Sequence, residues 1–206
     1  VNLGYTYLSP EEVMKQRDGK TTSVLLEEIL RSQLDRLNSI FYKGKSYGFS
    51  PDNIKAAIQS LRDLPHQEGY MATCEYAYDL LTLGKSFEQS IEGDKKSYTL
   101  KFIDWQNPEN NVYHVTEEFS VMRAGSHDHY RPDLVLFVNG IPLSVIECKR
   151  PDMKEPLKQA ISQHLRNQQE DGIRILYVYS QILLSTATNQ ARYGTNASEE
   201  KHWSIW

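Results

Sequence analysis

The chain has 206 residues, of which 39% are hydrophobic and 24% are charged, and its formal net charge at pH 7 is −4. The length fits one large domain, or a core with an elaborated N-terminal part, and the composition is that of an ordinary globular protein. A stand-alone DNA-binding protein usually carries a basic surface, so DNA binding by this acidic chain would require locally clustered basic residues or another domain.

The sequence contains no membrane or export signal. No apolar run approaches the roughly 18 residues that a membrane-spanning helix needs. Residues 1–10 lack the basic start and the apolar stretch of a signal peptide, so we expect a cytoplasmic protein. The two cysteines, Cys74 and Cys148, form no Cys-x-x-Cys pair, which argues against a zinc ribbon and against a disulfide framework.

The first half of the chain is predicted to be helical. We expect residues 1–22 to be an irregular lead-in with a short helix, since Ser9 and Pro10 are typical of an N-cap and a first helical position. A longer helix is predicted over about residues 23–41, because apolar residues recur there at the three- and four-residue spacing of one buried face. These apolar residues are Leu26, Ile29, Leu30, Leu34, Leu37 and Ile40.

Two more helices are predicted after a glycine-containing loop at residues 44–48. The first covers about residues 51–64 and is stopped by Pro65. The second covers about residues 71–83 and ends at Gly84. The N-terminal part is thus predicted to be a helical elaboration.

The periodicity then changes to that of strands. Strands are predicted over residues 98–103 and 112–123. Two short apolar runs, residues 134–138 and 141–146, follow on either side of Asn139-Gly140. Asn-Gly between apolar runs is the strongest short-range signal for a β-hairpin.

A helix is predicted next, over about residues 156–169, and strands are predicted over residues 173–179 and 182–185. The order of helices, strands, helix and strand indicates an α/β sandwich with a mixed sheet flanked by helices.

We expect one domain over residues 1–206. Its helical part covers about residues 1–95 and its α/β core about residues 96–190. The end at Trp206 carries no closing signal, so we expect the chain to be a fragment of a longer subunit.

Three charged residues flank the predicted hairpin. Asp133 stands at the start of its first strand, and Glu147 and Lys149 stand at the end of its second strand. Glu147 and Lys149 should share one face, about 6.6–6.8 Å apart along the strand at roughly 3.3–3.4 Å per residue. Cys148 should point to the other, apolar side and be buried there.

The register of the hairpin decides whether the two carboxylates meet. A strict two-residue turn would place Asp133 and Glu147 on opposite faces. A three-residue loop over residues 138–140, with Gly140 as a left-handed bulge, would place them on the same face. We predict this bulged loop or an equivalent irregularity, such as one at Pro142, which cannot donate a hydrogen bond to the ladder.

Two converging carboxylates form a hard oxygen site that suits Mg²⁺ or Mn²⁺. The backbone carbonyl of Cys148 could supply a third oxygen ligand, beside Asp133 and Glu147. Lys149 could orient or deprotonate an attacking water, or stabilise a charged phosphate. Glu-x-Lys alone usually marks a solvated strand end or a salt bridge. The full pattern of Pro-Asp, apolar strand, tight turn, apolar strand, Glu-x-Lys and helix is much more specific and predicts phosphodiester hydrolysis.

Residues 131–151 resemble the nuclease motif of the restriction (R) subunit of type I restriction-modification enzymes, which belong to the PD-(D/E)xK superfamily. The resemblance extends over most of the chain, and Asp133, Glu147 and Lys149 match the catalytic triplet. It implies a restriction-endonuclease-like fold and cleavage of double-stranded DNA. It also implies helicase-like motor domains that follow in the full protein and use ATP, and methyltransferase and specificity subunits as partners.

The resemblance also suggests further site residues. Many members carry Gln-x-x-x-Tyr in the helix after the lysine, for which Gln163 is the candidate and Gln159 the alternative. The tyrosine position falls on Asn167, which departs from that pattern. The first helix of the family often offers a glutamate to the metal, and Glu27 and Glu28 both qualify, although a solvated helix-face charge is an equally good interpretation of either residue.

No ATP site is expected within this chain. Gly44-Lys45-Ser46 and Gly84-Lys85-Ser86 each resemble the end of a phosphate-binding loop, but both lack its first glycine and lie in helical surroundings. Three basic residues near the triplet are candidates for DNA phosphate contacts, with plain surface charge as the alternative. They are Arg150, Lys154 and Lys158.

The sequence therefore predicts a metal-dependent endonuclease of double-stranded DNA within a type I restriction complex. One alternative is a repair or junction nuclease with the same catalytic core. Another is a non-catalytic docking module, in which Asp133, Glu147 and Lys149 merely form an ion-pair network.

Overall fold

The computed structural model describes residues 4–206, which form two compact units. The first, the sheet unit, contains the described residues up to Leu25, Tyr113–Phe137 and Ile141–Trp206. The second, the helical unit, contains Leu26–Val112 and Val138–Gly140. The chain thus passes from the sheet unit into the helical unit and back, and enters the helical unit again for three residues.

A seven-stranded mixed sheet organises the sheet unit, with the strand order β1-β6-β9-β10-β11-β12-β13. β1 pairs with β6 and β10 pairs with β11 in parallel, whereas β11, β12 and β13 pair antiparallel. The strands are β1 (Thr6–Tyr7), β6 (Tyr113–Glu117), β9 (Leu134–Val138), β10 (Ile141–Cys148), β11 (Ile182–Ala187), β12 (Gln190–Gly194) and β13 (Ser204–Ile205).

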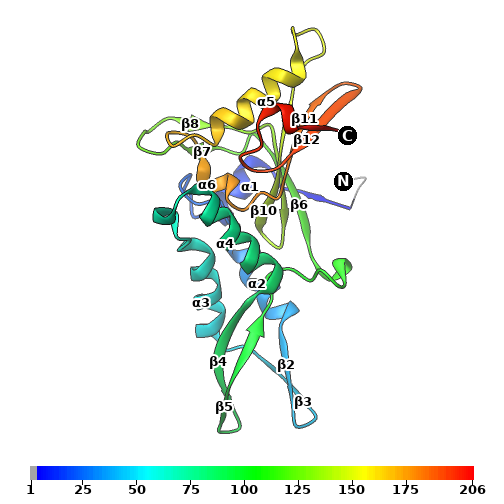
Figure 1. Cartoon of the computed structure of the whole chain (residues 1–206). Helices are drawn as coiled ribbons and strands as arrows, with labels where there is room; N and C mark the ends of the chain where they lie inside the picture. The colour runs from blue at the N-terminus through cyan, green and yellow to red at the C-terminus, as the bar shows by residue number, and fades with distance from the viewer. Residues whose placement is uncertain (1–3) are drawn as a thin grey trace. The chain divides into compact units, whose positions relative to one another are not determined.

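Helices flank this sheet: α1 (Pro10–Gln16), α5 (Pro156–Asn167) and the short α6 (Arg174–Tyr177). α5 contacts β10, β11 and β12 (Figure 1). The predicted α/β class, a mixed sheet flanked by helices, is confirmed and matches a restriction-endonuclease-like fold.

The short helix in the lead-in is confirmed. Ser9 is the N-cap of α1, Pro10 is its first residue, and Glu12 completes a capping box. The Ser9 hydroxyl accepts a hydrogen bond from the Glu12 backbone N–H at 3.2 Å, and the Ser9 N–H donates to the Glu12 carboxylate at 2.8 Å.

The predicted strand over residues 173–179 is wrong, because residues 174–177 form α6. Ile173, Leu176 and Tyr177 are all buried, and their three- and four-residue spacing suits one face of a helical turn. A short apolar run does not by itself distinguish a buried strand from a buried helical segment. The predicted strand over residues 182–185 is confirmed as part of β11.

The predicted strand over residues 112–123 is divided. β6 ends at Glu117, and Glu118 adopts a left-handed conformation with φ of 50°. The chain then forms the short strand β7 (Val121–Met122), which pairs with β8 (His129–Tyr130).

The helical unit contains α2 (Glu27–Leu37), α3 (Pro51–Arg62) and α4 (Tyr70–Leu83). α3 begins after the N-cap Ser50 and α4 ends at Gly84, so both predicted helices are confirmed. Two β-hairpins accompany them: β2 (Ser39–Tyr42) with β3 (Lys45–Gly48), and β4 (Lys85–Ile91) with β5 (Asp94–Leu100).

The helix predicted over residues 23–41 is shorter than expected. Asn38 leaves the helix in an extended conformation, and its side-chain amide donates to the carbonyls of Leu34 and Lys101 at 3.0 and 2.9 Å. An asparagine that bonds to the backbone in this way competes with helix continuation. The next residues form β2 instead of the last helical turn, and the loop predicted at residues 44–48 is the second strand of that hairpin.

No helix in residues 4–206 has both the length and the apolar character that a membrane crossing requires.

Candidate active site

The turn between β9 and β10 consists of two residues, Asn139 and Gly140, with φ of 52° and 83°. Two positive φ values are the mark of a type I′ turn, so the predicted three-residue bulged loop is wrong. The Asn139 side chain explains why the turn is tight. Asn139 is fully buried, accepts a hydrogen bond from the Val112 N–H at 2.9 Å and donates to the Phe102 carbonyl at 3.0 Å.

The Asp133 carboxylate nevertheless reaches the end of β10. Asp133 lies just before β9, so the strict alternation of a strand does not fix its side chain. The backbone around it is held by hydrogen bonds from the Glu118 N–H to the Asp133 carbonyl at 3.1 Å and from the Phe119 N–H to the Pro132 carbonyl at 3.3 Å. Asp133 Oδ2 accepts a hydrogen bond from the Cys148 N–H at 2.7 Å.

Glu147 is the buried member of the cluster, with 0% of its surface exposed. Neither of its carboxylate oxygens accepts a hydrogen bond from any residue that the structure describes, and neither does the buried hydroxyl of Ser185, which is opposite Glu147 in the β10–β11 register. Burial and then the negative charge of Asp133 raise the pKa of Glu147 from 4.5 to about 8. Two buried oxygens without hydrogen bonds are costly unless they bind a partner.

Lys149 connects the two carboxylates. Its Nζ lies 3.8 Å from Asp133 Oδ2 and 3.7 Å from Glu147 Oε2. It also donates a hydrogen bond to Gln163 Oε1 of α5 at 2.7 Å. The structure therefore brings together Asp133, Glu147, Lys149 and Gln163, as the sequence predicts.

This donor set fits a divalent metal ion. Within residues 4–206 no three His, Cys, Asp or Glu side chains gather as a metal site. Asp133 and Glu147 would thus be the two side-chain ligands, and the remaining ligands would be backbone carbonyls, water or phosphate oxygens, as Mg²⁺ prefers. The Cys148 carbonyl as a third ligand stays a prediction.

The prediction that Cys148 is buried is wrong, because its side chain is exposed. Cys148 is the last residue of β10. The strand does not extend past it, so no following strand residues cover its side chain. Its Sγ accepts a hydrogen bond from the Thr186 hydroxyl at 3.3 Å.

A model of the type I restriction enzyme R protein N terminus matches residues 1–202. The chain belongs to this family. The match covers both units of the structure, so the helical unit is as much a part of the family domain as the unit that carries Asp133, Glu147 and Lys149.

Similar proteins are named as endonuclease subunits of type I restriction enzymes. The putative MjaVIIIP endonuclease subunit of Methanocaldococcus jannaschii is 28% identical over 181 residues, which are 87% of this chain and 16% of that protein. The putative MjaIXP endonuclease subunit of the same organism is 32% identical over 130 residues, which are 63% of this chain and 12% of that protein. The HindI endonuclease subunit of Haemophilus influenzae is 29% identical over 130 residues, again 63% and 12%. The chain spans less than a fifth of the length of these relatives. The matches indicate a role in restriction.

The two glutamine candidates for the family motif have different surroundings. Gln163 contacts Lys149, whereas the Gln159 amide donates to the Lys154 carbonyl at 2.6 Å. The contact with Lys149 favours Gln163. Asn167, at the family's tyrosine position, is fully buried, and its amide donates to the hydroxyl of Tyr177 at 3.3 Å.

A network of buried, hydrogen-bonded polar side chains extends from Asn167 and Tyr177. The Tyr177 hydroxyl is 3.1 Å from His164 Nδ1, and His164 Nε2 is 3.2 Å from the Leu184 carbonyl. Burial lowers the pKa of His164 from 6.5 to about 4, so the imidazole is neutral. Its Nε2–H then donates to Leu184 and its Nδ1 accepts from Tyr177. The sequence analysis does not predict this network of side chains, because it places Tyr177 in a strand and not in a helix.

A pocket of about 580 Å³ opens beside the cluster. It contains two of the three basic residues expected to contact DNA, Lys154 and Lys158, whereas Arg150 lies outside its lining and pairs with Asp152 at 3.6 Å. The lining residues are Lys149, Lys154, Glu155, Lys158, Gln159, Ser162, Gln163 and Arg166. Basic side chains outnumber acidic ones four to one in this set, which suits a phosphate backbone.

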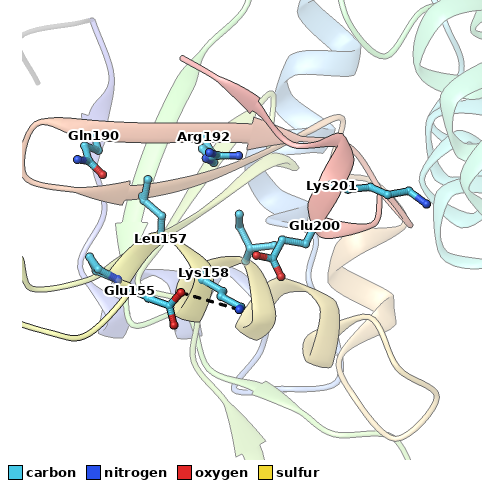
Figure 2. A pocket seen from close by; sticks show the side chains of 9 residues that line it. Glu155, Leu157, Lys158, Gln190, Arg192, Glu200 and Lys201 are labelled. Atoms are coloured by element: carbon cyan, nitrogen blue, oxygen red, sulfur yellow. Dashed lines mark ion pairs between the residues drawn. The ribbon is translucent and has the colours of Figure 1, made fainter.

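A second pocket, of about 570 Å³, shares Glu155 and Lys158 with the first (Figure 2). These two residues form an ion pair at 3.9 Å. Its other residues include Gln190 and Arg192 of β12 and the oppositely charged pair Glu200 and Lys201. No residue of the triplet lines it, so we assign the candidate active site to the first pocket.

Glu27 and Glu28, the candidates for a further metal ligand, are the first two residues of α2 in the helical unit. The Glu27 carboxylate is paired with the Arg62 guanidinium. A contribution from either glutamate to the metal site stays a prediction.

Proposed function

We propose that this chain is a divalent-metal-dependent nuclease domain that cleaves double-stranded DNA in type I restriction. The observation that carries the proposal is the Glu147 carboxylate, which is buried beside Asp133 and accepts no hydrogen bond at either oxygen within the described part of the chain, although Lys149 Nζ lies 3.7 Å from Oε2. A purely structural buried ion pair would be expected to have hydrogen bonds at these oxygens as well. A metal site would leave them available.

Asp133 and Glu147 would hold Mg²⁺ or Mn²⁺. The bound ion would lower the pKa of a water molecule and offset the negative charge that develops on the phosphate. Asp133 is also fixed by the Cys148 N–H at 2.7 Å, so one of its oxygens is oriented before any ion binds. This arrangement limits the reorganisation that metal binding requires.

Lys149 and Gln163 would act on the water and the phosphate. The Lys149 ammonium is within 3.8 Å of both carboxylates, so a water or phosphate oxygen near the metal would also lie near Lys149. The 2.7 Å hydrogen bond to Gln163 Oε1 restricts where Nζ can point. Lys149 would orient the attacking water and stabilise the charged phosphate, and Gln163 would position Lys149.

The rest of the full protein would supply what this chain lacks. The chain corresponds to 12–16% of its relatives' length, and its net charge is −4. We propose that motor domains elsewhere in the protein use ATP to deliver DNA, in a cytoplasmic complex with methyltransferase and specificity subunits. Tight DNA binding by an acidic chain is then not required.

Cleavage of a plasmid by the assembled full-length complex tests the proposal. Asp133→Ala and Lys149→Ala should each abolish double-strand cleavage, because one loses a metal ligand and the other the cation at the phosphate. ATP hydrolysis should be unchanged. Glu170→Ala, which removes a carboxylate whose side chain is 91% exposed, is the matched control and should cut normally.

Normal cutting by Asp133→Ala or Lys149→Ala would contradict the site assignment. In a non-catalytic docking module, these variants would also leave the activity of the complex unaffected, and Mn²⁺ would not bind to the chain.

A further inference from the structure

Arg166 is a fourth basic residue in the active-site pocket, and it lies in α5 three residues after Gln163. Residues three apart lie on the same face of a helix. Arg166 therefore faces the pocket together with the glutamine that bonds to Lys149. The positive charge of Arg166 also acts on Glu147, where it partly offsets the increase in the pKa of the carboxyl group.

The guanidinium of Arg166 is held in place from two sides. Its Cζ lies 4.4 Å from the centre of the Tyr130 ring, in a cation–π contact. Its Nη2 and Nε donate to Asn167 Oδ1 at 3.1 and 3.4 Å. Asn167 is itself fully buried and bonded to Tyr177, so the anchor is rigid.

The basic residues of the pocket differ in their partners. Lys149 is paired with Asp133 and Glu147, and Lys158 with Glu155. Among the residues that the structure describes, no carboxylate lies within ion-pair distance of Arg166 or of the exposed Lys154, and Arg166 differs from Lys154 in being held by Tyr130 and Asn167. An oriented guanidinium without an acidic partner, in a pocket beside two carboxylates, is suited to an anion that the chain itself does not provide.

We propose that Arg166 is a catalytic residue that binds a non-bridging oxygen of the DNA phosphate being cleaved, with Tyr130 and Asn167 as its positioning residues. This inference rests on the proposed nuclease function and adds a second cation to the site. Lys149 would orient the attacking water and contact the phosphate on the side that faces the metal ion. Arg166 would stabilise the charge that grows on the phosphate oxygens as the bond breaks.

The test is the cleavage rate at saturating DNA in the assembled full-length complex. Arg166→Ala should lower this rate by about 100-fold or more, in line with the loss of one preorganised donor. Arg166→Lys should recover only part of the rate, because lysine lacks the planar fork and its stacking on Tyr130. Mn²⁺ binding and ATP hydrolysis should be unchanged in both variants, which shows that the domain is folded and its metal ligands are intact.

Tyr130 provides a second line of evidence. Tyr130→Phe keeps the ring and should cut at a rate close to that of the unmodified complex, whereas Tyr130→Ala should be slower. A matched control is Arg31→Ala, which removes an exposed arginine of α2 in the helical unit and should have no effect on the rate.

The outcomes separate the two proposals. If Arg166→Ala cuts within about threefold of the normal rate while Asp133→Ala is inactive, the nuclease function stands and the role of Arg166 is refuted. If Arg166→Ala loses Mn²⁺ binding as well, Arg166 is structural and not catalytic. If Asp133→Ala cuts normally, the nuclease site is wrong and the inference about Arg166 falls with it.

Discussion

At the scale of single residues, Glu147 shows how a feature that would serve a metal ion also weakens the fold. Its carboxyl group is fully buried, and its pKa rises from 4.5 to about 8 through burial and the charge of Asp133. Between these two pH values the folded chain therefore holds a proton that the unfolded chain has lost. The free energy of unfolding must fall as pH rises through this window.

Replacement of the carboxyl group tests this coupling. In metal-free buffer, Glu147→Gln should gain stability relative to the unmodified chain as pH rises from 5 to 8, by on the order of 1 kcal/mol for each pH unit. The reason is that the amide cannot ionise. Urea unfolding of both proteins across this range measures the difference.

The comparison of two proteins also removes the contribution of His164, which has the opposite sign. Burial lowers the pKa of His164 to about 4, so its contribution to stability is lost as pH falls from about 6.5 towards 4. Stability curves of the two proteins that run parallel between pH 5 and pH 8 would show that folding does not raise the pKa of Glu147.

At the scale of elements, the β9–β10 hairpin depends on its turn. Gly140 has φ of 83°, and a Cβ placed there would lie 2.5 Å from the Leu26 carbonyl oxygen. Gly140→Ala should therefore destabilise the chain by about 1–3 kcal/mol, from backbone strain and this clash. Gly48→Ala is the control, because a Cβ at that position meets no atom within 4 Å.

Urea unfolding of the two glycine variants measures this effect. Equal stabilities would mean that the backbone at the turn is not constrained as described. Since the turn joins β9, which directly follows Asp133, to β10, which carries Glu147, Gly140→Ala should also weaken Mn²⁺ binding, whereas Gly48→Ala should not.

The elements also show what could be predicted from the sequence. The triplet and its hairpin were predictable, because the Asn-Gly turn and two apolar runs fix which ends meet. The backbone conformation that brings the Asp133 carboxylate close to Glu147 could not be predicted from the sequence. It depends on the irregular backbone before β9, where Asp133 is held by bonds to Glu118 and Cys148, and strand periodicity carries no information about such positions.

Other errors have local causes. The β4–β5 hairpin was predicted only in part, because its residues are mostly polar and at least partly exposed: β4 was not predicted, and the strand predicted over residues 98–103 overlaps β5 only at residues 98–100. α6 was predicted as a strand because it consists of a short buried run. Arg166 could not be singled out from the sequence, because its contact with Tyr130 joins residues 36 positions apart in the chain.

At the scale of the whole molecule, the chain belongs to the N-terminal family of type I restriction R proteins and corresponds to a small part of its relatives. Its own contribution in our account is narrow: two carboxylates and two cations around one phosphate. We propose that recognition and delivery of DNA belong to other parts of the assembly. The claim on which this account depends is that Asp133 and Glu147 bind a divalent cation.

Calorimetric titration of Mn²⁺ into the 206-residue chain at pH 8 tests that claim most directly. We predict saturable binding that weakens by up to about tenfold for each pH unit below 8, because protons compete for Glu147. Glu147→Gln and Asp133→Ala should each abolish this binding, and Glu170→Ala should retain it. Equal binding of Mn²⁺ by the unmodified chain and by Glu147→Gln, or no binding by either, would contradict the account.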